Sequence, residues 1–417
     1  MKKWTFSVCV LGLIITLSLG ACGRKPESKP VQPPVAIGVS IGNLDQEVAS
    51  ILQRVMKGRE KQDNTRIIWF DAGGDPAKQE EQIDNLIKKE VKAIILQVAK
   101  PEMGGLLAQK ILRENIKLVG IYSLPPETSL DGYVGVDTRR LGELQASLIA
   151  DKTGAKKSPG VPVLLLRGPQ VDYSLREMAD GFTAAGKELG LTIIPKDWDP
   201  QNPGFAEENL EMLLAQTGRP RAIAAHTDRQ TKLLLGIVER KGVAQDVLTV
   251  GTGATLEAAA ALASGTHNGE ADLQPEQVGN HAYQAAFDLA RTGTWNHDNV
   301  IRTGNSDLPA KIVPARLITR ENIYLLEQRY GQERLKQKQA ERKGGGGQEQ
   351  GGNSPPKGNP GNSPEGQQKS KVVITTADGN TMEFDVPGEI ISITVQKIEG
   401  QQQKQKEQPG GKQQQGQ

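Results

Sequence analysis

Between residues 35 and 322, short apolar runs alternate with amphipathic segments of helical spacing. The first run is VAIGVSI at 35–41, and the following segment, EVASILQRVMKGREKQ, has its apolar residues spaced as on one face of a helix. A strict alternation of strands and helices, with continuously apolar strands, predicts parallel sheets covered by helices on both faces. Roughly ten such units are more than one open sheet of ordinary size holds. We therefore predict an α/β fold with two doubly wound parallel-sheet lobes and a cleft between them.

The two cysteines of the chain, Cys9 and Cys22, both lie near its start. A short basic region, Met1-Lys2-Lys3, precedes an apolar segment over 6–19, which is too short for a stable membrane anchor and is typical of a signal peptide. Small residues directly before Cys22 resemble the lipobox of bacterial lipoproteins, in which the cysteine is acylated. We predict a signal peptide over 1–21, a lipid anchor at Cys22 and a Pro-rich tether over 22–34, with the body outside the cytoplasmic membrane. A plain secretory signal with an incidental cysteine is the alternative.

Composition changes after residue 322. Residues 323–343 could form a charged helix, and the Gly-, Pro- and Gln-rich stretch that ends at residue 370 predicts a disordered linker. Residues 371–400 contain three strand-like runs separated by Asp-Gly-Asn and Pro-Gly turns, which predicts a small β motif. Residues 401–417 are predicted to be a disordered Gln-rich tail.

The charge balance and the lack of catalytic motifs argue against several classes of function. Lysines and arginines number 51 against 49 acidic residues, so no strongly basic balance points to nucleic acid. The four histidines are scattered without an HExxH pairing, and neither GxSxG nor GxxxxGK[ST] occurs. In GTGATL at 251–256, Leu256 stands where a dinucleotide-binding loop needs its third glycine, so we interpret this segment as an ordinary strand-to-helix turn. We predict no enzyme, no metal and no cofactor.

Four segments resemble the sugar-binding proteins of bacterial transporters, most closely the ribose- and xylose-binding proteins. They are GDPAKQEEQIDNLIKKEVKAIIL at 74–96, YVGVDTRRLGELQASLIAD at 133–151, REMADGFTAA at 176–185 and LPAKIVPARLITREN at 308–322. The resemblance covers about residues 35–325 and implies the type I periplasmic-binding-protein fold. In that family the two lobes close on a solute by a hinge motion, and the permease of an ABC importer recognises the closed form.

The resemblance also implies three crossings between the lobes, which would form the hinge and are expected near residues 137–139, 273–275 and 303–307. The predicted lobes are 35–138 plus 274–303 at the N-terminal side and 139–273 plus 304–322 at the C-terminal side. Ligands of open parallel sheets bind beyond the carboxyl ends of the strands, so the ligand contacts should come from the loops that follow the strands.

The family's ligand contacts, transferred one position at a time, correspond to ten candidate ligand-binding residues in this chain. They are Asn43, Asp45, Gln97, Ser123, Asp137, Tyr173, Arg176, Thr227, Asp228 and Gln274. Some of these positions have a simpler explanation. Asp137 and Asp228 could only cap helices, and Arg176 could belong to a surface ion pair.

Several ligand contacts of the family are missing from this chain. Ser123 and Leu124 stand where an Asp-Arg pair is expected, Gly253 replaces an aspartate, and few aromatic rings are available to cover a sugar. Because hydrogen bonds to charged groups contribute about 1.5–3 kcal/mol each, their loss should abolish tight binding of a free pentose in the usual pose. Either the solute differs or the cleft no longer binds a sugar.

Two functions are therefore considered. The first is a monomeric, lipid-anchored solute-binding protein on the outer face of the membrane, which delivers a small sugar-like solute to an ABC importer. The second is a sensory or interaction lipoprotein that presents the same body to a membrane sensor or a cell-wall partner. The extent of the resemblance favours the first, whereas the altered contacts and the appended β motif favour the second.

Overall fold

The computed structural model describes residues 33–124, 129–197, 221–303, 306–344, 369–375 and 381–387. The chain divides into two compact units after residue 348. The predicted signal peptide, the predicted lipidation site Cys22 and most of the predicted tether lie outside the described residues.

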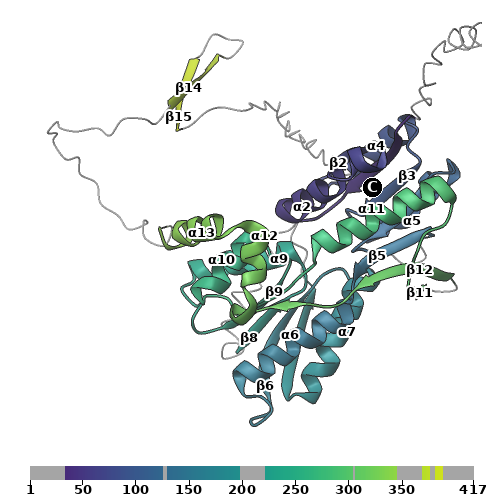
Figure 1. The fold of residues 1–417 in the computed structure, drawn as a ribbon. Helices are drawn as coiled ribbons and strands as arrows, with labels where there is room; N and C mark the ends of the chain where they lie inside the picture. Colours follow the sequence, from purple (N-terminus) through teal and green to yellow (C-terminus); the bar gives the residue numbers. More distant parts are fainter. Residues whose placement is uncertain are drawn as a thin grey trace, which may run out of the picture. The chain divides into compact units, whose positions relative to one another are not determined.

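The N-terminal lobe has a seven-stranded sheet at its centre (Figure 1). Its strands are β1 (Val35–Ile41), β2 (Thr65–Asp71), β3 (Ala93–Gln97), β4 (Lys117–Ile121), β5 (Gly132–Val136), β11 (Asn299–Thr303) and β12 (Ser306–Val313). Its helices are α2 (Gln46–Lys57), α3 (Glu60–Asp63), η1 (Pro101–Met103), α4 (Pro76–Lys88), α5 (Gly104–Arg113) and α11 (Pro275–Thr292). Alternate strand residues face opposite ways, so Ile95 of β3 packs with α2 and α11 on one face, and Ile94 packs with α4 and α5 on the other.

The C-terminal lobe repeats this plan with a six-stranded sheet. Its strands are β6 (Val161–Arg167), β7 (Leu191–Asp197), β8 (Ala222–Ala225), β9 (Leu248–Thr252), β10 (Gly269–Ala271) and β13 (Leu317–Ile318). Its helices include α6 (Thr138–Thr153), α7 (Tyr173–Glu188), α9 (Asp228–Arg240), α10 (Leu256–Ser264) and η2 (Arg320–Asn322). Phe182 of α7 belongs to the core on one face of the sheet, and Leu234 of α9 belongs to the core on the other.

The strand orders confirm the predicted fold of two doubly wound lobes. They run β2-β1-β3-β4-β5-β12-β11 in the first sheet and β7-β6-β8-β9-β10-β13 in the second, so both contain the doubly wound order 2-1-3-4-5. The sheets are not wholly parallel, because β11 is antiparallel to β12 and β13 is antiparallel to β10. Each lobe therefore adds an antiparallel edge strand to an otherwise parallel sheet.

The chain passes between the two sheets after β5, after β10 and after β12. The third crossing lies at residues 314–316, and the prediction that placed it near 303–307 is wrong. Strand β12 pairs in parallel with β5 from Ala310 opposite Tyr133 to Val313 opposite Val136, so residues 306–313 belong to the N-terminal lobe. The reason is the tight antiparallel hairpin of β11 and β12, which keeps the chain in the same sheet for one more strand.

The segment predicted as one charged helix over 323–343 forms two helices. These are α12 (Tyr324–Tyr330) and α13 (Gln332–Gly344), and they are separated by Gly331, whose φ of +85° is suited to glycine. Leu326, Tyr330 and Leu335 are buried against residues of α10. This segment is therefore part of the folded body and not a solvated extension.

In the second compact unit, β14 (Lys369–Thr375) and β15 (Thr381–Pro387) form an antiparallel hairpin. The two strands overlap the predicted β motif over 371–400, and β14 begins two residues before it. The predicted third strand and the Gln-rich tail lie outside the described residues.

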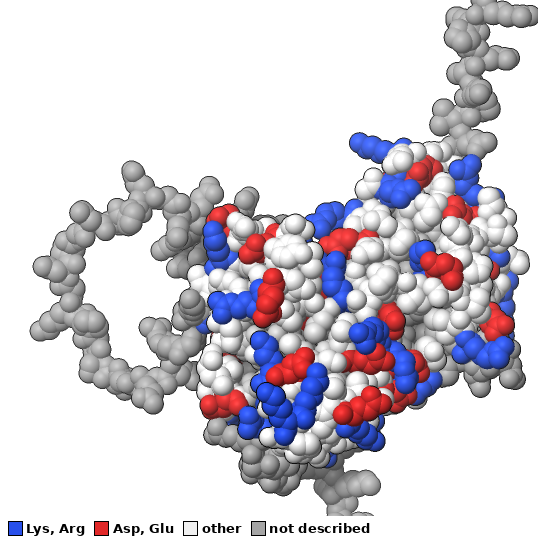
Figure 2. Space-filling model, turned by 60° about the horizontal axis from the view of Figure 1, so that its bottom comes forward, with Lys and Arg blue, Asp and Glu red and all other residues white. Residues whose placement is uncertain are grey.

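The surface of the first unit carries charges of both signs. On the face shown in Figure 2, Lys and Arg side chains are interspersed with Asp and Glu side chains, as the near-neutral charge of the whole chain leads one to expect. Among the helices that the structure describes, none combines the length and the apolar character needed to cross a bilayer.

Candidate functional site

A cavity of about 140 Å³ lies between the lobes, at the carboxyl ends of both sheets. Its walls come from the loops after β1, β3, β4, β6 and β8 and from the N-terminal ends of α6, α7 and α9. In each sheet the strand order reverses at the first strand, so the loops of neighbouring strands diverge and open a crevice there. The volume is close to that of a cavity of about 150 Å³ that binds benzene, so the space suits one six-membered ring.

Two hydrogen bonds join the lobes beside this cavity. The backbone N–H of Asp45 donates to Asp228 Oδ2 at 2.7 Å, and Arg229 Nη1 donates to Asn43 Oδ1. Next to them, Lys232 Nζ lies 3.6 Å from Asp45 Oδ2. Asn43 and Asp45 belong to the N-terminal lobe and the other three residues to the C-terminal lobe, so these contacts must break when the lobes separate.

Asp172, the N-cap of α7, joins the lobes at a second place. Its Oδ2 accepts hydrogen bonds from Ser123 Oγ and, at 3.1 Å, from the N–H of Leu124, while Oδ1 accepts from the N–H of Ser174 at 2.9 Å. Burial raises the pKa of Asp172, and the hydrogen bond from Ser123 opposes this shift. The predicted ligand contact Ser123 thus lines the cavity while its hydroxyl is already bonded across the lobes.

Gln97 lines the cavity at the end of β3, but its amide holds the loop after β1. Oε1 accepts from the N–H of Gly42 at 3.0 Å and of Asn43 at 2.7 Å, and Nε2 donates to the carbonyl of Val98 at 3.0 Å. Gln97 is therefore a positioning residue for the cavity wall in this closed arrangement.

Thr227 and Asp228 open helix α9 at the opposite wall. Thr227 Oγ1 caps the helix by accepting from the N–H of Gln230 at 3.2 Å, and Asp228 Oδ1 accepts from the N–H of Arg229 at 2.8 Å. Burial raises the pKa of Asp228 to about 6, against the opposing effect of the hydrogen bond from the Asp45 N–H. A carboxyl group with this pKa titrates in a mildly acidic range.

Gly253 explains one departure from the family pattern. Its φ is +117°, and a Cβ atom placed on it would lie 2.6 Å from Asp228 Cβ. An aspartate at this position would collide with Asp228 and would also strain the backbone. The turn after β9 therefore approaches Asp228 too closely in this structure to hold the aspartate of the family pattern.

The structure brings five of the ten predicted residues to the cavity: Asn43, Gln97, Ser123, Thr227 and Asp228. Asp137, Tyr173 and Arg176 are not among the residues that line it. Asp137 caps α6 by accepting from the N–H of Arg140 at 3.0 Å. Arg176 donates to the carbonyl of Gln170 at 3.1 Å, and its guanidinium lies 5.6 Å from the centre of the Tyr173 ring. Helix capping, the simpler explanation for Asp137, thus fits the position of this residue.

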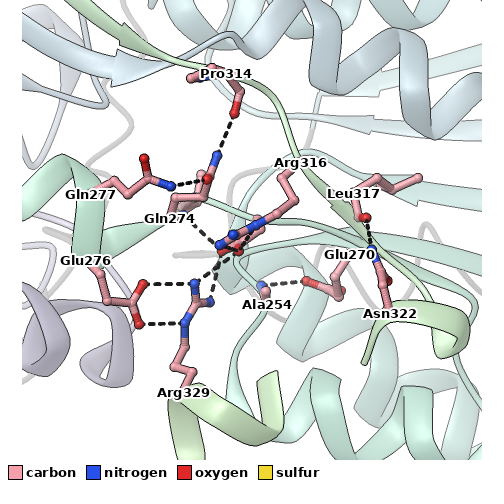
Figure 3. Close-up of polar contacts among 12 residues, drawn as sticks. Ala254, Glu270, Gln274, Glu276, Gln277, Pro314, Arg316, Leu317, Asn322 and Arg329 are labelled. Atoms are coloured by element: carbon pink, nitrogen blue, oxygen red, sulfur yellow. Dashed lines mark hydrogen bonds and ion pairs between the residues drawn. The ribbon is translucent and has the colours of Figure 1, made fainter. Parts of the chain in front are cut away.

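The last two predicted residues also lie elsewhere. Asp45 lines a separate, open groove at the mouth of the cleft and caps α2. Gln274 lies in the second crossing, where its Nε2 donates to the carbonyl of Pro314 at 2.6 Å and its Oε1 accepts from Gln277 Nε2 at 2.8 Å (Figure 3). Because Pro314 belongs to the third crossing, Gln274 ties two crossings together.

A buried ion-pair network surrounds this tie. Asp272, in the second crossing, is fully buried and accepts from Arg316 Nε at 3.0 Å and from Arg329 Nη1 at 2.9 Å. Arg329, from α12, also donates from Nε to Glu276 Oε1 at 2.8 Å (Figure 3). The network therefore joins the second crossing, the third crossing, helix α12 and the start of α11.

His226, Asp172 and Arg229 also line the cavity, although none of them is among the ten predicted residues. Thr227 and Asp228 were candidates because the family resemblance implies ligand contacts there. His226 directly follows β8 and precedes Thr227, so the general rule that ligands bind beyond strand ends would also have pointed to it. Both ring nitrogens of His226 are buried without a hydrogen-bond partner. Within the described ranges, no group of three or more His, Cys, Asp or Glu side chains is placed to hold a metal ion.

The raised pKa of Asp228 predicts a pH dependence of stability. The folded protein binds the proton of Asp228 more tightly than an unfolded chain, whose aspartates have a pKa near 3.8. The stabilising effect of that proton is complete below about pH 4 and is lost as the pH rises through about 6. Over this window, the free energy of unfolding of the wild type should fall relative to that of Asp228→Asn by on the order of 2 kcal/mol.

The measurement is chemical denaturation of both proteins at pH values from about 4 to about 7. The difference in slope is the test, because the amide of Asp228→Asn does not titrate even if the substitution shifts the stability at every pH. Parallel curves for the two proteins would contradict the assignment of the raised pKa to Asp228.

Comparisons with known proteins agree with this geometry. The profile of a periplasmic binding protein domain matches residues 37–294. The ribose import binding protein of Bacillus subtilis is 25% identical over 300 residues, covering 69% of this chain and 93% of the relative. The D-xylose-binding periplasmic protein of Haemophilus influenzae is 22% identical over 299 residues, covering 69% and 87%.

A solved structure supports the same fold. The solute-binding protein of an ABC transporter from Bacillus halodurans, with bound myo-inositol, superposes with a TM-score of 0.57 at 20% identity. The match covers 72% of this chain and all of that one.

Proposed function

Because this chain belongs to the family of periplasmic binding protein domains, we propose that it is a non-enzymatic extracytoplasmic solute-binding protein that delivers a small, sugar-like solute to an ABC importer. The observation that carries the proposal is the cavity between the lobes, which lies at the carboxyl ends of both sheets and is closed by hydrogen bonds between them. The relatives named for ribose and xylose and the solved structure with myo-inositol support an uncharged polyhydroxy compound as the solute class.

The proposed mechanism is opening and closing about the three crossings. Opening breaks the bonds from Asp45 to Asp228, from Arg229 to Asn43 and from Ser123 to Asp172, and it admits the solute. A solute that contacts both lobes stabilises the closed form, which the importer would recognise. The proposal includes a monomeric body held at the outer face of the membrane by a lipid on Cys22, because the residues before that cysteine resemble a lipobox.

The proposal predicts that a solute raises the melting temperature of the purified chain, since binding to the folded state alone stabilises it. The compounds are D-ribose, D-xylose, D-glucose and myo-inositol, each measured separately, with D-glucuronate as a charged counterpart. Ala99 lines the cavity, so Ala99→Phe should fill it and remove the shift.

The matched control is Leu106→Phe, at a side chain that is 51% exposed and not among the cavity residues, and it should keep the shift. A folded wild type whose melting temperature responds to none of the uncharged compounds would contradict the proposal and favour a sensory or interaction role. A shift that survives in Ala99→Phe would place the binding site elsewhere.

A further inference from the structure

His226 is the buried polar residue of the cavity whose hydrogen-bonding groups are unused. It directly follows β8, lines the cavity and is 1% exposed. The ring packs edge-on against Phe182, with the centroids 5.6 Å apart and the planes at 68°. Its backbone N–H is bonded to the carbonyl of Leu166 at 3.2 Å, so the backbone position is set by the sheet.

Both ring nitrogens of His226 are buried without a partner. Buried polar groups are almost always hydrogen-bonded, and a neutral imidazole offers one donor and one acceptor. Burial, together with the charge of Arg167, lowers the pKa of His226 to about 3, so the ring is uncharged near neutral pH. His267, the other fully buried histidine of the described chain, is bonded at both nitrogens, to Thr249 at 2.7 Å and to Glu270 at 2.7 Å.

Other polar side chains of the cavity are already engaged. The oxygens of Asp172 and Asp228 accept hydrogen bonds from both lobes, the amide of Gln97 bonds to the backbone at both ends, and Arg229 is bonded to Asn43. Among the buried unpartnered side-chain atoms of the described residues, only the two His226 nitrogens belong to a residue of the cavity wall. The cavity wall also has apolar contributions from Leu141, Leu175, Met178 and Leu273.

We propose that His226 is the solute-recognition residue of the cavity, where its ring donates one hydrogen bond to, and accepts one from, hydroxyl groups of an uncharged ring whose other face packs on the apolar wall. This inference rests on the proposed function and specifies the solute: uncharged, hydroxylated on one side and apolar on the other. A charged solute is disfavoured because the charged side chains of the wall are already paired with protein groups.

The test compares His226→Phe with the wild type, using whichever of D-ribose, D-xylose, D-glucose or myo-inositol raises the wild-type melting temperature. Phenylalanine keeps the ring and its contact with Phe182 but removes both nitrogens. The affinity measured by calorimetry should fall about 10- to 100-fold, while the melting temperature without solute stays equal or rises, because two unpaired polar atoms are gone. A purely structural role would give the opposite pair of results.

The matched control is His267→Phe, which removes a histidine that is bonded at both nitrogens. It should lower the melting temperature, because Glu270 is left buried without that partner, and should keep the wild-type affinity. As a second measurement, ¹⁵N NMR of the wild type should show the ring nitrogens of His226, and not those of His267, shifting when the compound is added.

The outcomes separate the two proposals. Wild-type affinity in His226→Phe, or ring nitrogens of His226 that do not respond, would overturn this inference and leave the proposed function standing. If none of the uncharged compounds binds to the wild type, both proposals fail. Binding of D-glucuronate with equal affinity would overturn the assignment of an uncharged solute.

Discussion

Replacing Arg329 by methionine is expected to lower the free energy of unfolding by about 3–5 kcal/mol, because it removes one partner from a buried ion-pair network. The Arg329 side chain is 4% exposed and bonds to both carboxylate oxygens of Asp272 and of Glu276. Methionine fills a similar volume but leaves Asp272 with Arg316 alone among its cationic partners in the described chain. Urea denaturation followed by far-ultraviolet circular dichroism would measure the loss.

The matched control is Arg302→Met, at a side chain that is 79% exposed and pairs with Asp307 on the surface. Because solvent screens such a pair, this variant should stay within about 0.5 kcal/mol of the wild type. A loss below about 1 kcal/mol for Arg329→Met would mean that the network contributes little beyond a surface pair.

Replacing Gly142 by alanine is expected to destabilise the protein by about 3 kcal/mol, although alanine favours helices. Helices α6 and α7 cross in close contact, and a Cβ atom on Gly142 would lie 2.0 Å from the carbonyl oxygen of Met178. Unlike the end of a flexible side chain, a backbone oxygen cannot move away by a change of rotamer. The two helices would have to separate, and the core under the C-terminal wall of the cavity would be disturbed.

Gly236→Ala is the control for this second prediction, since it makes the same change within helix α9. The nearest atom to a Cβ there is Arg240 Nη1 at 3.4 Å, the end of a long side chain. This variant should therefore raise the free energy of unfolding by about 0.5–1 kcal/mol, through helix propensity alone. Changes of the same sign in the two variants would contradict the packing argument.

The alternation of strands and helices was readable from the sequence because it depends on local periodicity. The apolar run at 35–41 is β1 in the structure, and the amphipathic segment after it forms α2 and the short helix α3. Which distant segments pair in a sheet was harder to predict from the sequence. Residues 306–313 join β5, from which they are separated by most of the C-terminal lobe, and no local pattern marks that partner.

Five of the ten residues transferred from the family resemblance line the cavity, in agreement with the general rule that ligands bind beyond the ends of parallel strands. That rule selects positions but does not say what each side chain does, because a residue after a strand often also begins a helix. Asp137 and Thr227 both follow strands and both cap helices, yet only Thr227 lines the cavity. Gln274 satisfies the same positional rule and ties two crossings together instead.

The sequence by itself determined the α/β class, the two doubly wound lobes and the edge at which a site forms, since backbone geometry and hydrophobic spacing set these within short segments. Only the tertiary structure decided which polar groups are left available at that edge. Whether a hydrogen-bonding atom is engaged depends on neighbours from remote strands and from the other lobe. That is why Gln97, selected from the sequence, is already bonded, and His226, which was not selected, keeps both ring nitrogens unpartnered in the cavity wall.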